Sequence, residues 1–193
     1  MDLSARDVLL LPLLFLIGLV IKLEDGGPVL YTQQRIGRNG KPFNVIKFRS
    51  MVVNAHDVLL RWLEESPEIK QEYVQNNFKL RNDPRTTKMG KWLRRYSLDE
   101  LPQLWNVIKG EMSLVGPRPL LERELQDYGK TIELYKQARP GITGIWQISG
   151  RSKTKFSDRA NLDAWYIRNW SLWYDIYILL KTVVVVIKRD GAY

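Results

Sequence analysis

The chain opens with an apolar segment that is too short for a simple membrane span. Residues 8–21 contain no charged or strongly polar side chain, whereas a spanning helix needs ~20 apolar residues. Pro12 removes one backbone hydrogen bond within this segment and bends a helix there. A helix that enters one leaflet, breaks at the proline and returns would account for both features. A buried core helix is the alternative, although the segment is apolar on every face. A secretory signal is disfavoured because Asp2 and Asp7 oppose a basic n-region.

Two strand-like runs follow the apolar segment. Residues 29–36 and 43–51 are rich in strand-forming side chains, and they flank residues 37–42, which contain an Asn-Gly turn pair. The second run alternates in part and places Lys47 and Arg49 on one face. The pattern predicts a β-hairpin, and it leaves open whether the basic face is solvated or functional.

Helical patterns dominate the rest of the chain. Residues 54–65 read as an amphipathic helix, and Ser66-Pro67 then opens a second helix that we expect to extend through Phe78. Residues 163–188 combine three tryptophans with a nearly unbroken apolar run, which is typical of an aromatic core or of a helix in a membrane interface. Beside the apolar N-terminus, the interface is favoured. We therefore expect an α+β fold that is mainly helical, with a small β-hairpin and several amphipathic interfacial helices.

Composition restricts the chemistry that the chain can perform. It has 193 residues, no cysteine and a single histidine, His56, which we expect to be a plain surface residue. Thiol chemistry and multi-histidine metal sites are therefore excluded, and a histidine-based triad is disfavoured. The net charge of +9 indicates an anionic partner, either nucleic acid, a membrane leaflet or a phosphorylated substrate. The sequence contains neither a Walker-type phosphate loop nor a dinucleotide-binding glycine motif.

The stretch RRYSLDELPQLWN holds two adjacent carboxylates, Asp99 and Glu100. Ser97 and Glu100 match the spacing of a capping box, so the simplest interpretation is a helix start. Pro102 fits that interpretation poorly, because it removes an amide N–H that the first turns of a helix need. We therefore expect irregular backbone around the pair, as at many active sites.

A functional interpretation of the acidic pair follows from its spacing. Adjacent helical side chains point ~100° apart, so Asp99 and Glu100 cannot face each other as an acid and a base. They can approach one diphosphate from two sides, one as a nucleophile at phosphorus and the other as a ligand of magnesium (Mg²⁺). Nearby arginines would neutralise the negative charge that spreads over the phosphoryl oxygens.

Four ordered segments then resemble the bacterial sugar transferases, or monotopic phosphoglycosyl transferases. They are GGPVLYTQQRIGRNGKPFNVIKFRSM, DPRTTKMGKWLRRYSLDELPQLWNVIKGEMSLVGPRP, RPGITGIWQISGR and the C-terminal LDAWYIRNWSLWYDIYILLKT with KRDGAY. Together they extend over nearly the whole chain. This resemblance implies transfer of a hexose 1-phosphate from a UDP-sugar to undecaprenyl phosphate, with release of UMP, as the first step of exopolysaccharide, capsule or O-antigen synthesis.

The resemblance also implies roles for individual residues. Asp99 matches the nucleophile that carries a covalent phosphosugar, and Glu100 matches its Mg²⁺-binding partner. Four charged residues match positions around the substrate phosphates, namely Lys47, Arg94, Arg118 and Asp163. Pro12 matches the break in a re-entrant helix, which divides the chain into a membrane segment, 1–24, and a cytoplasmic catalytic domain with membrane-surface helices, 25–193.

The resemblance further implies a place in the cell and a longer parent protein. The protein would lie at the cytoplasmic face of the bacterial inner membrane. A basic pair usual before the position of Asp2 is missing here, and members with this C-terminus often carry upstream transmembrane helices, so we expect the chain to be part of a longer protein. Galactose and glucose are the favoured sugars, and a homodimer is left open. A nucleic-acid-binding module and a non-catalytic membrane scaffold are the alternatives, and no recognised nucleic-acid motif supports the first.

Overall fold

The computed structural model describes residues 5–75, 80, 82–150 and 156–188. Its α-helices and strands, in chain order, are α1 (Ala5–Asp25), β1 (Leu30–Ile36), β2 (Pro42–Phe48), α2 (Ala55–Glu65), α3 (Pro67–Gln75), α4 (Lys88–Arg95), α5 (Leu104–Ile108), β3 (Ser113–Val115), α6 (Ile132–Gln137), β4 (Gly141–Thr143), α7 (Ile145–Ile148), α8 (Phe156–Arg168) and α9 (Leu172–Lys188). Short 3₁₀ helices complete it: η1 (Arg38–Gly40), η2 (Leu98–Gln103), η3 (Glu122–Glu124) and η4 (Gln126–Thr131). The prediction of a mainly helical α+β fold is thereby confirmed.

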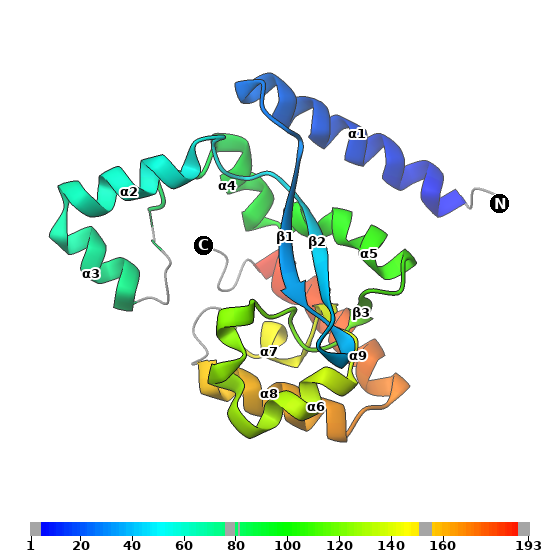
Figure 1. Cartoon of the computed structure of the whole chain (residues 1–193). Coiled ribbons are helices and arrows are strands. Elements are labelled where there is room, and N and C mark those ends of the chain that lie inside the picture. The colour runs from blue at the N-terminus through cyan, green and yellow to red at the C-terminus, as the bar shows by residue number, and fades with distance from the viewer. Residues whose placement is uncertain (1–4, 76–79, 81, 151–155, 189–193) are drawn as a thin grey trace.

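The β1–β2 hairpin extends through the middle of the molecule, from the region of α1 and α4 to α6 (Figure 1). Its strands pair antiparallel from Leu30 opposite Phe48 to Ile36 opposite Pro42. The connecting turn is η1, in which Asn39 takes a left-handed conformation with φ of 60°, a region that asparagine tolerates better than most residues. The predicted hairpin is confirmed, and β2 delivers Lys47 to the centre of the protein.

The apolar N-terminal segment forms helix α1, which continues through Pro12. Ile17 and Ile21 are buried in a cluster with Phe48 of β2 and Leu93 of α4. Other apolar side chains of α1 face outward, and Phe15 is 74% exposed. Within the described ranges, no helix is both long and apolar enough to cross a membrane. The re-entrant course predicted for residues 1–24 stays a prediction.

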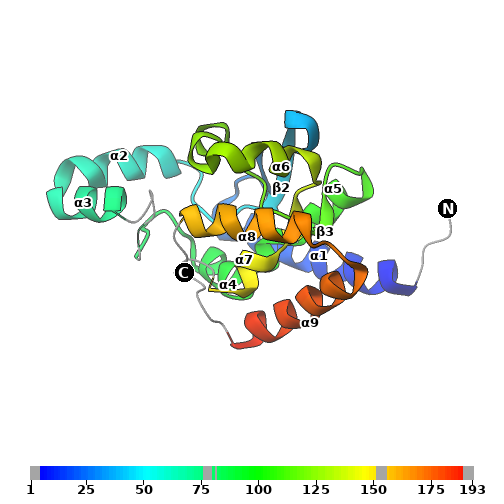
Figure 2. The same ribbon diagram turned by 90° about the horizontal axis from the view of Figure 1, so that it is seen from below.

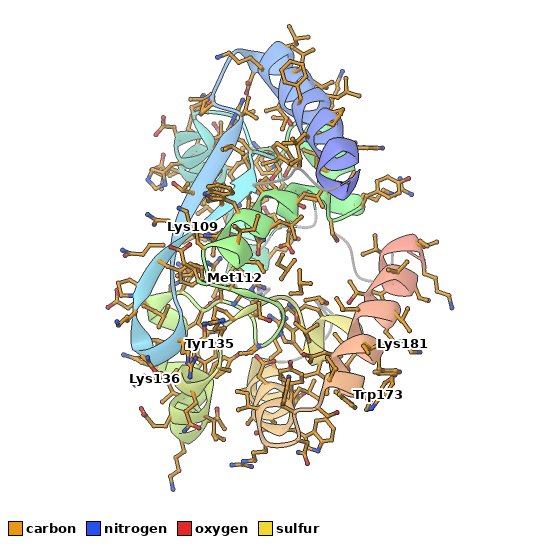
Figure 3. The ribbon with its side chains drawn as sticks, turned by 90° about the vertical axis from the view of Figure 1, so that its right-hand side faces the viewer. Lys109, Met112, Tyr135, Lys136, Trp173 and Lys181 are labelled. Atoms are coloured by element: carbon orange, nitrogen blue, oxygen red, sulfur yellow. The ribbon has the colours of Figure 1, made fainter. Side chains whose placement is uncertain are left out.

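Helix α9 presents most of its apolar side chains to the outside. Only Ile178 of this helix is buried, while Trp170 just before it is 60% exposed and Trp173 is 80% exposed. Trp173 and Lys181 point away from the body of the protein (Figure 3). Helices α1 and α9 lie toward the same side of the molecule, opposite α2 and α6 (Figure 2). An ordinary aromatic core at the C-terminus is therefore the wrong interpretation.

Two short strands, β3 and β4, pair in parallel, with Ser113 opposite Gly141 and Val115 opposite Thr143. Gly116 and Gly141 allow this close approach, because a Cβ at Gly141 would lie 2.2 Å from the Gly116 nitrogen. The Tyr135 hydroxyl, beneath the hairpin, donates to the Ile36 carbonyl (2.5 Å) and accepts from the Leu120 amide (3.1 Å). The sequence patterns did not predict this parallel pair, because three-residue strands carry almost no periodic signal.

The helical pair α2–α3 projects to one side of the hairpin (Figure 1) and confirms the two helices predicted there. His56 is exposed on α2, as expected for a plain surface residue. The prediction that the second helix reaches Phe78 extends outside the described residues.

Candidate active site

An irregular turn carries the acidic pair between α4 and α5. Ser97 adopts a left-handed conformation with φ of 54°, and the next six residues form the 3₁₀ helix η2, which contains Asp99, Glu100 and Pro102. The Ser97 side chain caps nothing, because an N-cap residue needs an extended backbone. The predicted capping box is therefore wrong. The predicted irregular backbone is confirmed.

Lys47 of β2 connects directly to the acidic pair. Its Nζ donates a 2.6 Å hydrogen bond to Glu100 Oε1, and both side chains are partly exposed. Burial and, second to it, the negative charge of Glu100 raise the pKa of Asp99 to about 6, against the opposing positive charges of Lys47 and Arg94. Perturbed carboxylates of this kind are concentrated at functional sites. Asp99 is therefore held as a carboxylate that is unusually basic for an aspartate.

Arg94, near the end of α4, is fixed beside Asp99 by close packing. Its Nε donates to Ser50 Oγ at 2.8 Å. Burial lowers the pKa of Arg94, and the charge of Asp99 partly restores it. The helix α4 itself begins with Thr87, whose hydroxyl accepts from the Gly90 amide at 2.9 Å. A Cβ at Gly90 would lie 2.0 Å from the Ser50 carbonyl oxygen, so glycine allows α4 to approach Ser50.

Arg118 and Glu100 both line a cavity of about 110 Å³. Its other polar lining residues are Arg35, Lys47, Gln103, Trp146 and Gln147. The guanidinium carbon of Arg118 lies 5.6 Å from the centre of the Trp146 ring, and that of Arg159 lies 4.6 Å from it. Trp146, which the sequence left open between core and interface, is buried and supports two cations.

Asp163 does not line this cavity. It is 1% exposed on α8, and its Oδ2 accepts from the Tyr128 hydroxyl at 2.9 Å. Burial raises the pKa of Asp163 to about 7, and the hydrogen bond from Tyr128 and the charges of Arg118 and Arg159 oppose the shift. The structure thus brings Lys47, Glu100 and Arg118 to one cavity with Asp99 and Arg94 adjacent. It places Asp163 behind Arg118, as a support for the cations.

Three residues of this region were missed by the sequence patterns. Asn106 is fully buried and connects α5 to β2, since its side chain accepts from the Ile46 amide (3.1 Å) and donates to the Asn44 carbonyl (2.8 Å). Arg35 is buried on β1, and its pKa is lowered to about 10 by burial and by the charge of Arg118. Gln103 is buried at the end of η2. Asn106 gave a signal, as a polar residue within an apolar stretch, but such a residue does not reveal its partners.

The site offers carboxylates for a cation but no complete protein cage. Among the described residues, no group of three or more histidine, aspartate or glutamate side chains could hold a metal ion. Mg²⁺ commonly uses one or two carboxylates together with the phosphates of its substrate. Glu100 provides such a carboxylate, so the residues present fit Mg²⁺ that arrives with a diphosphate.

Comparison with known proteins places this fold and site in a family. The family model described as "Bacterial sugar transferase" matches residues 4–189. The chain therefore belongs to the bacterial sugar transferase family, as the resemblance indicated.

Curated relatives differ in length and in the sugar that their names mention. The chain is 52% identical to a protein of Erwinia amylovora named "UDP-galactose-lipid carrier transferase", over 96% of this chain and 38% of that protein. It is 42% identical to the "UDP-glucose:undecaprenyl-phosphate glucose-1-phosphate transferase" of Escherichia coli K12, over 96% and 38%. It is 45% identical to the "Exopolysaccharide production protein ExoY" of Rhizobium meliloti, over 100% and 86%. The chain thus spans well under half of the first two relatives and most of the third.

Proposed function

We propose that this chain transfers a hexose 1-phosphate from a UDP-sugar to undecaprenyl phosphate, with Asp99 as the nucleophile. The observation that carries the proposal is the environment of Asp99: a half-buried, basic carboxylate flanked by Lys47 and Arg94 and adjacent to Glu100. The names of the relatives from Erwinia amylovora and Escherichia coli supply the donor and acceptor classes.

In the first step, an Oδ atom of Asp99 attacks the β-phosphorus of the UDP-sugar. The new Asp99–phosphorus bond forms as the bond to the bridging oxygen breaks, and UMP leaves with the electron pair. A pKa of about 6 leaves the carboxylate roughly nine-tenths ionised at pH 7. It also makes Asp99 a stronger base than an ordinary aspartate, and hence a better nucleophile.

In the second step, a phosphate oxygen of undecaprenyl phosphate attacks the same phosphorus. The Asp99–phosphorus bond breaks, the carboxylate is regenerated and the sugar leaves as a diphosphate-linked lipid. Lys47, Arg94 and Arg118 stabilise the negative charge that spreads over the phosphoryl oxygens in both steps. Asp163 holds Arg118 in place through its buried charge.

Glu100 is the proposed ligand of Mg²⁺, which would neutralise the diphosphate of the donor when bound. In the structure Glu100 accepts from Lys47. A metal ion bound to Glu100 would replace this hydrogen bond, and Lys47 Nζ could then donate to a substrate phosphate. One carboxylate therefore serves both to hold the lysine before the donor arrives and to hold the metal afterwards.

We further propose that the chain acts at the cytoplasmic face of the inner membrane. The outward apolar side chains of α1 and α9, which lie toward one side of the molecule (Figure 2), support this location. A re-entrant course of residues 1–24, with the catalytic domain at 25–193, would place Asp99 within reach of a lipid phosphate.

The test is detection of the covalent intermediate. The protein is incubated with UDP-galactose or UDP-glucose and Mg²⁺ without acceptor, and intact-mass spectrometry with peptide mapping locates the hexose-phosphate adduct. The adduct is expected on Asp99 and absent in Asp99→Asn. The matched control is Asp127→Asn, an exposed aspartate, which should form the adduct normally. An adduct on another residue, or turnover by Asp99→Asn, would contradict the proposal.

A further inference from the structure

We propose that the cavity beside the acidic pair holds the uracil base of the donor nucleotide, and that Gln103 and Gln147 read its edge. The cavity lies between β2, η2 and the segment 141–147. This inference rests on the proposed function and extends it, because it assigns the part of the protein that selects the nucleotide.

Gln103 is the first observation. It is only 3% exposed and lines the cavity. A largely buried amide that lines a cavity is placed to donate to and accept from a ligand bound there. Gln103 ends the same 3₁₀ helix that carries Asp99 and Glu100. A ligand bound to Gln103 is therefore held in a fixed relation to the nucleophile.

Gln147 and Trp146 are the second observation. Gln147 Oε1 and Trp146 Nε1 are both buried and have no partner among the described residues. Gln147 Nε2 donates to the Ile142 carbonyl at 3.4 Å, which sets the orientation of its amide. Two buried groups that lack partners thus line one small cavity together with Gln103. The amides of Gln103 and Gln147 can each donate and accept.

The chemistry of this lining suits a nucleobase. The imide edge of uracil presents acceptor, donor and acceptor in one plane, which glutamine amides and an indole N–H can match. Val45, Pro119 and Ile142 also line the cavity and provide apolar contacts for the faces of a flat ring. The volume of about 110 Å³ is well below the ~300–1,000 Å³ of pockets that enclose a complete ligand. The cavity therefore receives one portion of the donor.

The charges favour the nucleotide end of the donor over the hexose end. Arg35 and Arg118 line the cavity in addition to Lys47, and the pKa of Arg35 is lowered in part by the charge of Arg118. Arg35 is already paired with Glu124 (Nη1 to Oε2, 3.4 Å), so Arg118 and Lys47 are the cations that would meet the phosphates of the donor. The nucleoside end brings a second phosphate, whereas the hexose brings none.

The experiment measures binding without turnover. Dissociation constants of UMP and of ribose 5-phosphate, which lacks the base, are measured for the full-length protein in detergent. The wild type is expected to bind UMP at least tenfold more tightly than ribose 5-phosphate. Gln103→Leu and Gln147→Leu should each reduce that ratio by about tenfold, which corresponds to 1.4 kcal/mol, and leave the affinity for ribose 5-phosphate unchanged. Gln34→Leu, the same change at an exposed position, should alter neither.

Several outcomes would overturn the uracil subsite. Equal weakening of UMP and ribose 5-phosphate in both variants would mean that the glutamines only support the fold. An unchanged ratio with an altered preference between UDP-galactose and UDP-glucose would place the hexose in the cavity. If Gln103→Leu does not fold, the deciding measurement is the ratio of the UMP and ribose 5-phosphate dissociation constants for Gln147→Leu. A wild type that forms the Asp99 adduct but shows no preference for UMP overturns the subsite alone, whereas a clear preference without the adduct overturns the proposed function.

Discussion

Lys47 and Glu100 lie 53 positions apart in the chain, and the lysine Nζ donates a 2.6 Å hydrogen bond to the glutamate Oε1. The pair joins the central hairpin to the turn that carries Asp99. Lys47 lowers the pKa of Asp99 while Glu100 raises it, so the two residues change the basicity of the nucleophile in opposite directions.

Removing the lysine charge should shift the pH dependence of the first step. In Lys47→Met the pKa of Asp99 should rise above about 6, because a stabilising positive charge is lost. The acid limb of the pH–rate profile for adduct formation should then move to higher pH, and the rate of adduct formation at pH 7 should fall. Single-turnover mass spectrometry between pH 5 and 8.5 measures the limb. Lys41→Met, at an exposed lysine, is the control, and an unmoved limb in Lys47→Met would contradict the coupling.

Replacing the glutamate tests the metal assignment. Glu100→Gln removes a carboxylate ligand, and we expect adduct formation to fall about 100-fold, in the range for loss of one electrostatic stabiliser. The residual rate should no longer depend on Mg²⁺ concentration. A Mg²⁺ titration of the wild type and the variant measures this. Glu133→Gln, an exposed change, should keep the wild-type dependence, and a Glu100→Gln variant with that same dependence would show that Mg²⁺ is held elsewhere.

The buried carboxylate of Asp163 should cost stability at neutral and alkaline pH. Its pKa is raised from 3.8 to about 7 in the folded protein, so the native state binds more protons than the unfolded state between these values. Stability contributed by this group is complete below pH 3.8 and is lost as pH rises through 7. Asp163→Asn should therefore have a higher Tm than the wild type at pH 8.5, and the difference should shrink toward pH 4. A difference independent of pH would mean that Asp163 is not the titrating group.

The loss of Asn106 should destabilise the site as a whole. Asn106→Leu leaves the Ile46 amide and the Asn44 carbonyl without their side-chain partners in a partly buried region. Each such loss costs about 1–3 kcal/mol, so we expect a total of about 2–6 kcal/mol and a Tm lowered by roughly 4–24 °C. Thermal unfolding in detergent measures the change. Asn161→Leu, an exposed asparagine on α8, is the control, and an equal Tm for wild type and Asn106→Leu would refute the role of this connection.

Much of the secondary structure was predictable because its signals are local. The hairpin followed from alternating side chains around an Asn-Gly turn, and the helical pair α2–α3 followed from periodicity and a proline at a helix start. The wrong prediction of a capping box at Ser97 also has a local cause. The capping-box spacing was present, but the left-handed backbone at Ser97 turns the hydroxyl away from that role.

The sequence by itself determined the chemistry that the chain can offer. With no cysteine and one exposed histidine, only carboxylates, hydroxyls and amines remained, and the adjacent Asp99 and Glu100 were the natural candidates. Tertiary structure decided how the predicted cations are placed around that pair. Lys47, Arg94 and Arg118 come from three distant segments, and Asp163, expected among them, lies behind Arg118. The local sequence pattern predicts the conformation of each segment. The pKa of a carboxylate, in contrast, depends on burial and on charges that only tertiary packing brings together.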